Sequence, residues 1–282
     1  MISNGWPAPA KLNLFLHVIG RRPDGYHLLQ TAFQFVDFSD LLDFCIRPDS
    51  GLSLRTNYST INPEADLSLR AARLLQRETG CNSGADIRIT KRIPMGGGLG
   101  GGSSNAATTL AALNTLWSLG LTTEQLTELG LRLGADVPIF LYGHAAWAEG
   151  IGEELTPIEP EEGWYLIIYP GCHVPTADIF RAADLTRNTP AITIRDFLGS
   201  GGHNDCEAVV RHRFPAVAEA LDWLQQYADV RMTGSGSSVF ARFDSSDQAA
   251  AIYDLLPSGW QGFVARALNR SPLLERLERE GK

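Results

Sequence analysis

Residues 94–107 read Pro94-Met95-Gly96-Gly97-Gly98-Leu99-Gly100-Gly101-Gly102-Ser103-Ser104-Asn105-Ala106-Ala107, and this stretch decides the fold. A strand-like segment, residues 85–90, precedes it, and an alanine-rich helical run to Leu113 follows. Glycines let backbone N–H groups approach an anion, and the start of a helix adds about half a positive charge. The order strand, glycine loop, helix therefore predicts a phosphate site, with Ser103 and Ser104 offering hydroxyls to a phosphate or its Mg²⁺.

Three other interpretations of the glycine run are weaker. The spacing Gly96-x-Gly98-x-x-Gly101 satisfies the dinucleotide-binding pattern, which also needs an acidic residue about 20 positions later, near the end of a second strand. Residues 121–124 instead join two predicted helices. A P-loop would end in a lysine, which is missing here. A tight connection needs one or two glycines, whereas six of the seven residues from 96 to 102 are glycine. A ligand that requires bare backbone is therefore favoured.

Composition excludes several classes of protein. The 282 residues are 44% hydrophobic and 20% charged, as in globular domains, and the net charge of −8 comes without a long basic run. A nucleic-acid partner is therefore not expected. No apolar stretch approaches the ~20 residues of a membrane span, and the four cysteines lack zinc-site spacing. We expect a cytoplasmic protein with reduced cysteines and no membrane partner.

Hydrophobic periodicity predicts an α+β chain. Residues 10–20 alternate as a half-buried strand, which places Lys11 and Asn13 on one face. Residues 66–79 have helical spacing, with Asp66 as cap and Gly80 as terminator. The helix after the glycine loop is expected to open with hydroxyl and amide caps at residues 103–105. Further strands are expected at residues 32–38, 41–46, 52–55, 164–169, 239–243 and 262–267, and further helices at 123–133, 216–227 and 246–256.

A domain boundary is expected near residues 153–163. This segment is acidic and contains Pro157, Pro160 and Gly163, a composition typical of a linker. We predict an N-terminal domain of residues 1–154, which carries the glycine loop, and a C-terminal domain of residues 155–282.

The glycine loop resembles the phosphate loop of the GHMP small-molecule kinases, the family of galactokinase, homoserine kinase and mevalonate kinase. Five further segments resemble the same family: Pro9-Ala10-Lys11-Leu12-Asn13-Leu14, Arg22-Pro23-Asp24-Gly25-Tyr26-His27, Leu133-Gly134-Ala135-Asp136-Val137-Pro138, Asn204-Asp205-Cys206-Glu207 and Thr233-Gly234-Ser235-Gly236-Ser237-Ser238-Val239-Phe240. The resemblance implies two α+β lobes with the active site in the cleft between them, and an enzyme that uses ATP with Mg²⁺. We expect a monomer or weak homodimer.

The long glycine run is similar to one branch of that family. Its members phosphorylate the 2-hydroxyl of 4-diphosphocytidyl-2-C-methyl-D-erythritol, a cytidine-diphosphate-linked methylerythritol, in the non-mevalonate route to isoprenoid precursors. The resemblance therefore implies this acceptor. Two alternatives stay open: a sister kinase that acts on homoserine or a mevalonate, and a non-catalytic sugar or nucleotide sensor with the same fold.

The resemblance implies a catalytic pair. Asp136 matches the aspartate that takes the proton of the acceptor hydroxyl, although an Asp beside Gly134 is by itself typical of a turn or cap. Lys11 matches the lysine that supports it electrostatically, although a strand Lys alone is typical of a solvated edge. No protein ligand of the metal is assigned.

The resemblance also implies binding residues. Tyr26 and Phe180 match rings that stack on the cytosine, and His27 matches a group that hydrogen-bonds the edge of that base. Asn13 matches a further substrate contact. Taken alone, such residues are typical core or capping groups. Asp66 stands where the family pattern has Asn, and Asp205 and Glu207 have no assigned role. The implied nucleotide contacts are Pro94, Met95, Gly96, Gly97, Gly98, Leu99, Gly100, Gly101, Gly102, Ser103, Ser104, Lys91 and Asp66.

Overall fold

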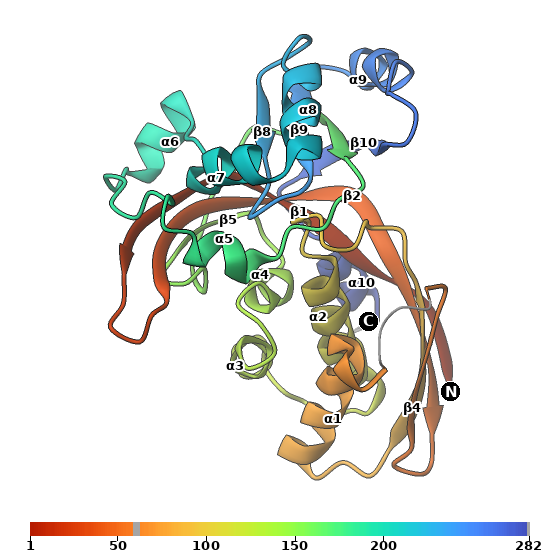
Figure 1. Ribbon diagram of the computed structural model, residues 1–282. Coiled ribbons are helices and arrows are strands. Elements are labelled where there is room, and N and C mark those ends of the chain that lie inside the picture. The colour runs from red at the N-terminus through yellow and green to blue at the C-terminus, as the bar shows by residue number, and fades with distance from the viewer. Residues whose placement is uncertain (59–62, 281–282) are drawn as a thin grey trace.

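A long antiparallel hairpin organises the molecule. In the computed structural model, which describes residues 1–58 and 63–280, β1 (Ile2–Arg21) and β2 (His27–Arg47) run side by side through both halves of the protein (Figure 1). The sequence predicted separate segments at 32–38 and 41–46, and the structure joins them in β2.

Residues 10–20 form a strand as predicted, but the expected half burial is wrong, because every residue of β1 from Ala8 to Val18 is buried. Three clusters of buried apolar side chains lie along this strand. Trp6 belongs to the first, Leu12 to the second and Leu16 to the third. A polar side chain in the middle of β1 is therefore desolvated, which costs free energy unless it finds partners.

The strands form one mixed sheet, ordered β3-β4-β2-β10-β7-β9-β8, with β1 and β5 also paired to β2 and β6 paired to β5. The remaining strands are β3 (Leu52–Thr56), β4 (Gly84–Thr90), β5 (Ala146–Glu149), β6 (Glu154–Pro157), β7 (Trp164–Tyr169), β8 (Val230–Met232), β9 (Val239–Phe243) and β10 (Gln261–Leu268). The predicted strands at 52–55, 164–169, 239–243 and 262–267 are thus confirmed.

The first lobe carries the helices that follow the early strands. Asp66 caps the first of them by accepting from Ser68 N, and Gly80 ends it at φ +68°, as predicted. Thr122 and Gln125 form the predicted capping box. The helices of this lobe are η1 (Pro63–Ala65), α1 (Leu67–Thr79), α2 (Gly101–Leu116), α3 (Thr123–Leu131), α4 (Val137–Tyr142) and α10 (Pro272–Glu280).

The prediction of a hydroxyl or amide cap on the helix after the glycine loop is wrong. The helix α2 starts at Gly101, and its N-cap is Gly100 in the left-handed conformation, with no side-chain capping bond. Ser103 and Ser104 lie inside the first turn, so their hydroxyls are not used as caps.

The second lobe packs five helices against β7–β10. These helices are α5 (Thr176–Arg181), α6 (Ile194–Ser200), α7 (Asp205–Arg213), α8 (Pro215–Leu224) and α9 (Ser246–Tyr253). The lobes are joined by β10, which pairs with both β2 and β7. The C-terminal helix α10 returns to the first lobe, where Leu273 enters its core (Figure 1). Among the described residues, the helices are all too short or too polar to cross a membrane.

Candidate active site

Lys11 lies at the centre of the candidate site. The β1–β2 register shifts on both sides of the Lys11–Asn13 stretch, and such bulges re-aim side chains beside active sites. Lys11 is 2% exposed. Its ammonium donates to Asn13 Oδ1 and, at 3.1 Å, to the Gly98 carbonyl. The predicted shared face of Lys11 and Asn13 is confirmed, and this lysine is a buried, fully engaged cation rather than a solvated edge residue.

The Asp136 carboxylate faces the Lys11 ammonium, with 3.4 Å between Asp136 Oδ2 and Lys11 Nζ. Asp136 occupies the N-cap position of α4, but its side chain accepts no capping hydrogen bond there. That side chain is 40% exposed. A carboxylate that neither caps its helix nor is buried is available to a ligand.

The glycine loop is held from two sides. Lys11 N donates to the Leu99 carbonyl at 3.1 Å, and Ser238 N from the second lobe donates to the Gly97 carbonyl at 3.0 Å. The loop is therefore fixed between β1 and the β8–β9 connection before any nucleotide binds.

Close packing explains part of the glycine run. A Cβ on Gly98, which has a φ of +76°, would lie 2.3 Å from the Thr233 carbonyl oxygen. A Cβ on Gly102 would instead meet only Leu67 Cδ1, at an ordinary 3.8 Å. Protein contacts thus require glycine at 98 but not at 102.

The start of α2 is open to an anion. Its first-turn amides have no side-chain cap, and unpaired amides at a helix N-terminus favour negative charge. Among the described residues, the buried Ser104 hydroxyl has no hydrogen-bond partner. An orphaned buried hydroxyl in the first turn of an uncapped helix fits an oxygen-rich ligand.

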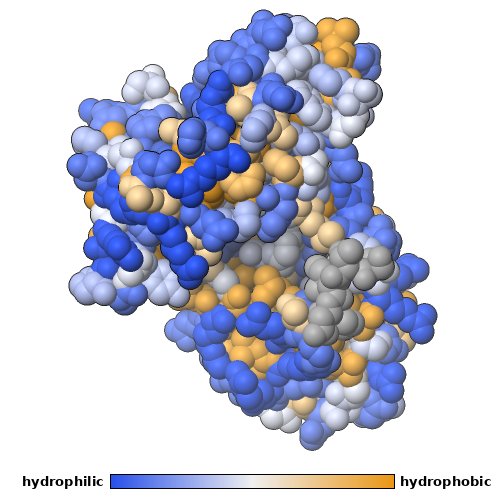
Figure 2. All heavy atoms as spheres, viewed as in Figure 1, coloured by the Kyte–Doolittle hydropathy of each residue, from blue (hydrophilic) through white to orange (hydrophobic). Residues whose placement is uncertain are grey.

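Two adjoining pockets form the cleft. The first pocket has a volume of about 320 Å³. Its lining includes Lys11, Asn13, Gly98, Gly100, Ser103 and Asp136. The other, of about 490 Å³, includes Tyr26, His27 and Phe180. Leu29, Ala135, Ile151, Thr176 and Phe180 line both, so the pockets are continuous. Figure 2 shows this face hollowed between the two lobes.

The structure thus brings the expected catalytic pair and the expected acceptor-binding residues into one cleft. The remaining expected nucleotide contacts do not line these two pockets, and their role stays a prediction: Pro94, Met95, Gly96, Gly97, Leu99, Gly101, Gly102, Ser104, Lys91 and Asp66.

Arg187 holds the second pocket together and was not found from the sequence. Its Nε donates to His27 Nε2 at 3.1 Å, and its Nη2 donates to the Phe180 and Ala182 carbonyls at 3.0 and 2.6 Å. No sequence signal links an arginine to a histidine 160 positions away. The His27 ring packs on Phe180, with centroids 5.2 Å apart, while Tyr26 is 60% exposed at the mouth.

The electrostatics of this pocket favour a neutral His27. Burial, followed by the charges of Arg187 and Arg21, lowers the pKa of His27 below the usual value for histidine. Because His27 Nε2 accepts from Arg187, the proton of the neutral ring belongs on Nδ1. His27 can therefore offer one N–H donor to a ligand.

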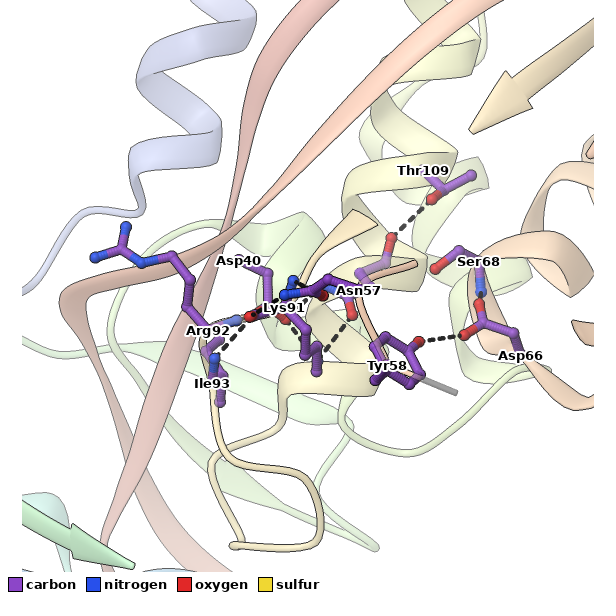
Figure 3. Close-up of polar contacts among 10 residues, drawn as sticks. Asp40, Asn57, Tyr58, Asp66, Ser68, Lys91, Arg92, Ile93 and Thr109 are labelled. Carbon is purple, nitrogen blue, oxygen red and sulfur yellow. Dashed lines mark hydrogen bonds and ion pairs between the residues drawn. The ribbon is translucent and has the colours of Figure 1, made fainter. Parts of the chain in front are cut away.

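Lys91 is part of a buried network beside the glycine loop (Figure 3). Its ammonium lies 2.5 Å from Asp40 Oδ2 and donates to Asn105 Oδ1 at 2.9 Å. Asp40 is fully buried, and its other oxygen accepts from the backbone N–H groups of Arg92 and Ile93. A Cβ on Gly101 would lie 2.9 Å from Lys91 Nζ, so this cation lies close to the start of α2. Asp40 was missed because it lies between two predicted strands, residues 32–38 and 41–46, where no local signal marks an aspartate as buried.

Asp66 is engaged by the protein itself. Its Oδ1 accepts from Ser68 N at 2.8 Å and its Oδ2 from the Tyr58 hydroxyl at 3.0 Å (Figure 3). Burial, followed by the charge of Asp66, raises the pKa of Tyr58. The tyrosine therefore stays a hydrogen-bond donor, and Asp66 acts as the cap of α1.

Comparison with known proteins agrees with this geometry. Residues 66–144 match the GHMP kinases N terminal domain, and residues 183–261 match the GHMP kinases C terminal domain. The chain belongs to the GHMP kinase family, and its fold is the two-lobed α+β fold of that family.

Particular relatives are closer. The chain is 57% identical to 4-diphosphocytidyl-2-C-methyl-D-erythritol kinase of Nitrosococcus oceani, over 98% of this chain and 99% of that one. A crystal structure of 4-(cytidine 5'-diphospho)-2C-methyl-D-erythritol kinase superposes with a TM-score of 0.80 at 33% identity, covering 95% of this chain and 99% of the other. Mevalonate kinase of Methanococcus jannaschii shares the fold at 17% identity, with a TM-score of 0.70 over 95% of this chain and 98% of that one.

Proposed function

We propose that this protein transfers the γ-phosphoryl group of ATP to the 2-hydroxyl of 4-diphosphocytidyl-2-C-methyl-D-erythritol. The observation that carries the proposal is the single cleft in which the Lys11–Asp136 pair adjoins the pocket of Tyr26, His27 and Phe180. The high identity to relatives named for this kinase supports the same acceptor.

The open start of α2 receives the triphosphate. The first-turn amides and the Ser104 hydroxyl supply donors, and the helix dipole adds favourable charge. Because Lys11 bonds the Gly98 carbonyl, the loop and the catalytic lysine move as one unit. Phosphoryl transfer depends mostly on such positioning and charge stabilisation.

Mg²⁺ fits this arrangement as a companion of ATP. The orphaned Ser104 hydroxyl suits a hard cation that keeps few protein ligands and several phosphate oxygens and waters. No group of three or more His, Cys, Asp or Glu residues in the described chain forms an all-protein metal cage. Bound there, the ion supplies charge neutralisation on the phosphate oxygens.

Asp136 acts as the general base. It accepts the proton of the acceptor hydroxyl as that oxygen attacks the γ-phosphorus, and the bond to the β-phosphate oxygen breaks to release ADP. Lys11, 3.4 Å away, offsets the negative charge that gathers at the hydroxyl oxygen and the carboxylate. Asn13, held by Lys11 and by the Thr31 hydroxyl at 3.0 Å, lines the same pocket and orients the acceptor.

The second pocket binds the cytosine. Tyr26 and Phe180 supply ring faces for stacking, and the Nδ1–H of neutral His27 donates to an acceptor on the pyrimidine edge. Cytosine has an unprotonated ring nitrogen there, whereas uracil carries N–H, so a fixed donor favours cytosine.

An acceptor panel tests the proposal. The purified chain is incubated with ATP, Mg²⁺ and, separately, the cytidylyl acceptor, its uridylyl analogue, homoserine and mevalonate. The proposal expects rapid ADP release with the cytidylyl compound alone, and a product with one new phosphate on the 2-hydroxyl by ³¹P NMR. Turnover with homoserine or mevalonate instead would identify a sister kinase, and the absence of ADP release with every acceptor would indicate a non-catalytic sensor.

A further inference from the structure

Asn204 stands behind the active site and bonds the loop that closes it. This residue is 7% exposed and does not line the cleft pockets. Its Nδ2 donates to two carbonyls, Met232 O and Gly234 O, both at 2.8 Å. The two bonds bracket Thr233, the residue between them. Asn204 therefore fixes the backbone on both sides of one side chain.

Thr233 transmits that position to the catalytic strand. Its hydroxyl accepts from Asn13 N at 2.9 Å and donates to the Gly98 carbonyl at 3.4 Å. The same Gly98 carbonyl accepts from Lys11 Nζ. One buried threonine hydroxyl thus joins the acceptor-binding strand, the glycine loop and the catalytic lysine.

Asn204 is itself firmly placed. Its Oδ1 accepts from Cys206 N at 2.9 Å, which makes it the N-cap of α7. Glu207 in the same helix accepts from Met232 N at 3.3 Å. Helix α7 thereby holds the start of the β8–β9 connection in place. The side-chain amide of Asn204 also binds the Gly234 carbonyl, further along that connection.

We propose that Asn204 is a positioning residue for phosphoryl transfer, acting through Thr233 on Asn13, Gly98 and Lys11. The inference rests on the proposed function for its rate measurement. Because displacements near 1 Å from a distant mutation can cost about 100-fold in rate, the expected effect falls on kcat rather than on folding.

The test combines two substitutions. Asn204→Ser keeps a side chain that can cap α7 but removes both donors, and Thr233→Val removes the hydroxyl at nearly constant shape. Each is expected to lower kcat about tenfold or more. Because they break one chain of contacts, the double variant should match the slower single variant within about twofold. Wild-type kcat in Asn204→Ser, or losses that multiply in the double variant, would overturn the proposal.

A matched control separates positioning from general weakening. Ser245→Ala removes the N-cap of α9, where Ser245 Oγ accepts from Gln248 N at 3.2 Å, away from the cleft. It should lose thermal stability and keep wild-type kcat. If Asn204→Ser does not fold, Asn204→Asp replaces it, since it retains the capping oxygen and still lacks the donors.

Hydrogen exchange measures the effect of Asn204 on the Asn13 amide directly, without requiring turnover. The Asn13 amide, protected by Thr233 Oγ1, should exchange faster in Asn204→Ser than in wild type or Ser245→Ala. Unchanged exchange would refute the positioning role even in an active enzyme. A wild-type chain that fails to phosphorylate the cytidylyl acceptor would instead refute the proposed function and leave the exchange result standing.

Discussion

The Lys11 ammonium lies 3.4 Å from the Asp136 carboxylate, and the two side chains come from different elements of the first lobe. Lys11 is buried in β1, whereas Asp136 is half exposed beside a pocket. The buried partner is held by two further acceptors, Asn13 Oδ1 and the Gly98 carbonyl. The pair is therefore a fixed cation facing a carboxylate that remains open to a ligand.

Replacing Asp136 by Asn tests the base. Asp136→Asn keeps the shape and removes the proton acceptor, so kcat should fall about 100-fold or more while ATP affinity stays near that of wild type. Steady-state kinetics and calorimetry measure the two effects. Asp184→Asn, which removes a surface carboxylate paired with Arg213, is the control and should keep its rate. Unchanged turnover in Asp136→Asn would make Asp136 a structural residue.

Two glycines of one loop should respond differently to alanine. In Gly98→Ala the new Cβ meets the Thr233 carbonyl at 2.3 Å in a left-handed backbone, so we expect a loss of about 2 kcal/mol or more of unfolding free energy. Gly102→Ala meets no such contact and should unfold like wild type, yet bind ATP more weakly because it crowds the phosphates. Thermal unfolding and ATP calorimetry on both variants check this. Wild-type ATP affinity in Gly102→Ala would contradict the placement of the triphosphate.

The Lys91–Asp40 pair should matter for folding. Lys91→Met leaves the fully buried Asp40 carboxylate without its cation, which typically costs about 3–5 kcal/mol. Denaturant titration measures the loss. Arg88→Met, in β4 just before Lys91, is the matched control. Its pair with Asp43 involves a side chain that is 67% exposed, and surface pairs contribute little. Equal stability of both variants would contradict the importance of the buried network.

The pH profile should report His27. Because the pKa of His27 is lowered by burial, Arg187 and Arg21, the ring is neutral at neutral pH, and kcat/KM for the cytidylyl acceptor should fall only when the pH drops below the ordinary titration range of histidine. Arg21→Gln removes one of the charges that lower this pKa, so the pKa rises and the fall begins at higher pH. NMR titration of the His27 ring follows the same midpoint. A midpoint that stays fixed or moves down in Arg21→Gln would refute this assignment.

Local sequence signals predicted most elements because their causes are local. Asp66, Gly80 and the Thr122–Gln125 box mark helix ends by contacts within a few residues. The error at the start of α2 has the same origin: hydroxyls at 103 and 104 look like caps, but the chain turns one residue before Gly101 through a left-handed glycine. Local patterns therefore identify the helix, but the residue that caps it depends on the backbone conformation of Gly100.

Long-range relations could not be predicted from the sequence. Alternation in β1 predicts one buried face, whereas tertiary packing also buries the other, where Lys11, Asn13 and Phe15 are at most 3% exposed. The resemblance to GHMP kinases led to the residues of the cleft, but Arg187 and Asn204 act through partners 160 and 30 positions away. Such pairings are fixed by folding, and a motif that contains one of these residues, as at Asn204, does not say which distant residue it contacts.

The central claim is that one cleft holds both substrates, with the cytosine at Tyr26 and Phe180, the 2-hydroxyl at Asp136 and the phosphates at the start of α2. A crystal structure of the chain with a non-hydrolysable ATP analogue and the cytidylyl acceptor tests it most directly. We predict the triphosphate against the amides of residues 101–103, and the acceptor hydroxyl between Asp136 and the γ-phosphate. A nucleotide bound elsewhere, with the start of α2 free of phosphate, would contradict the account.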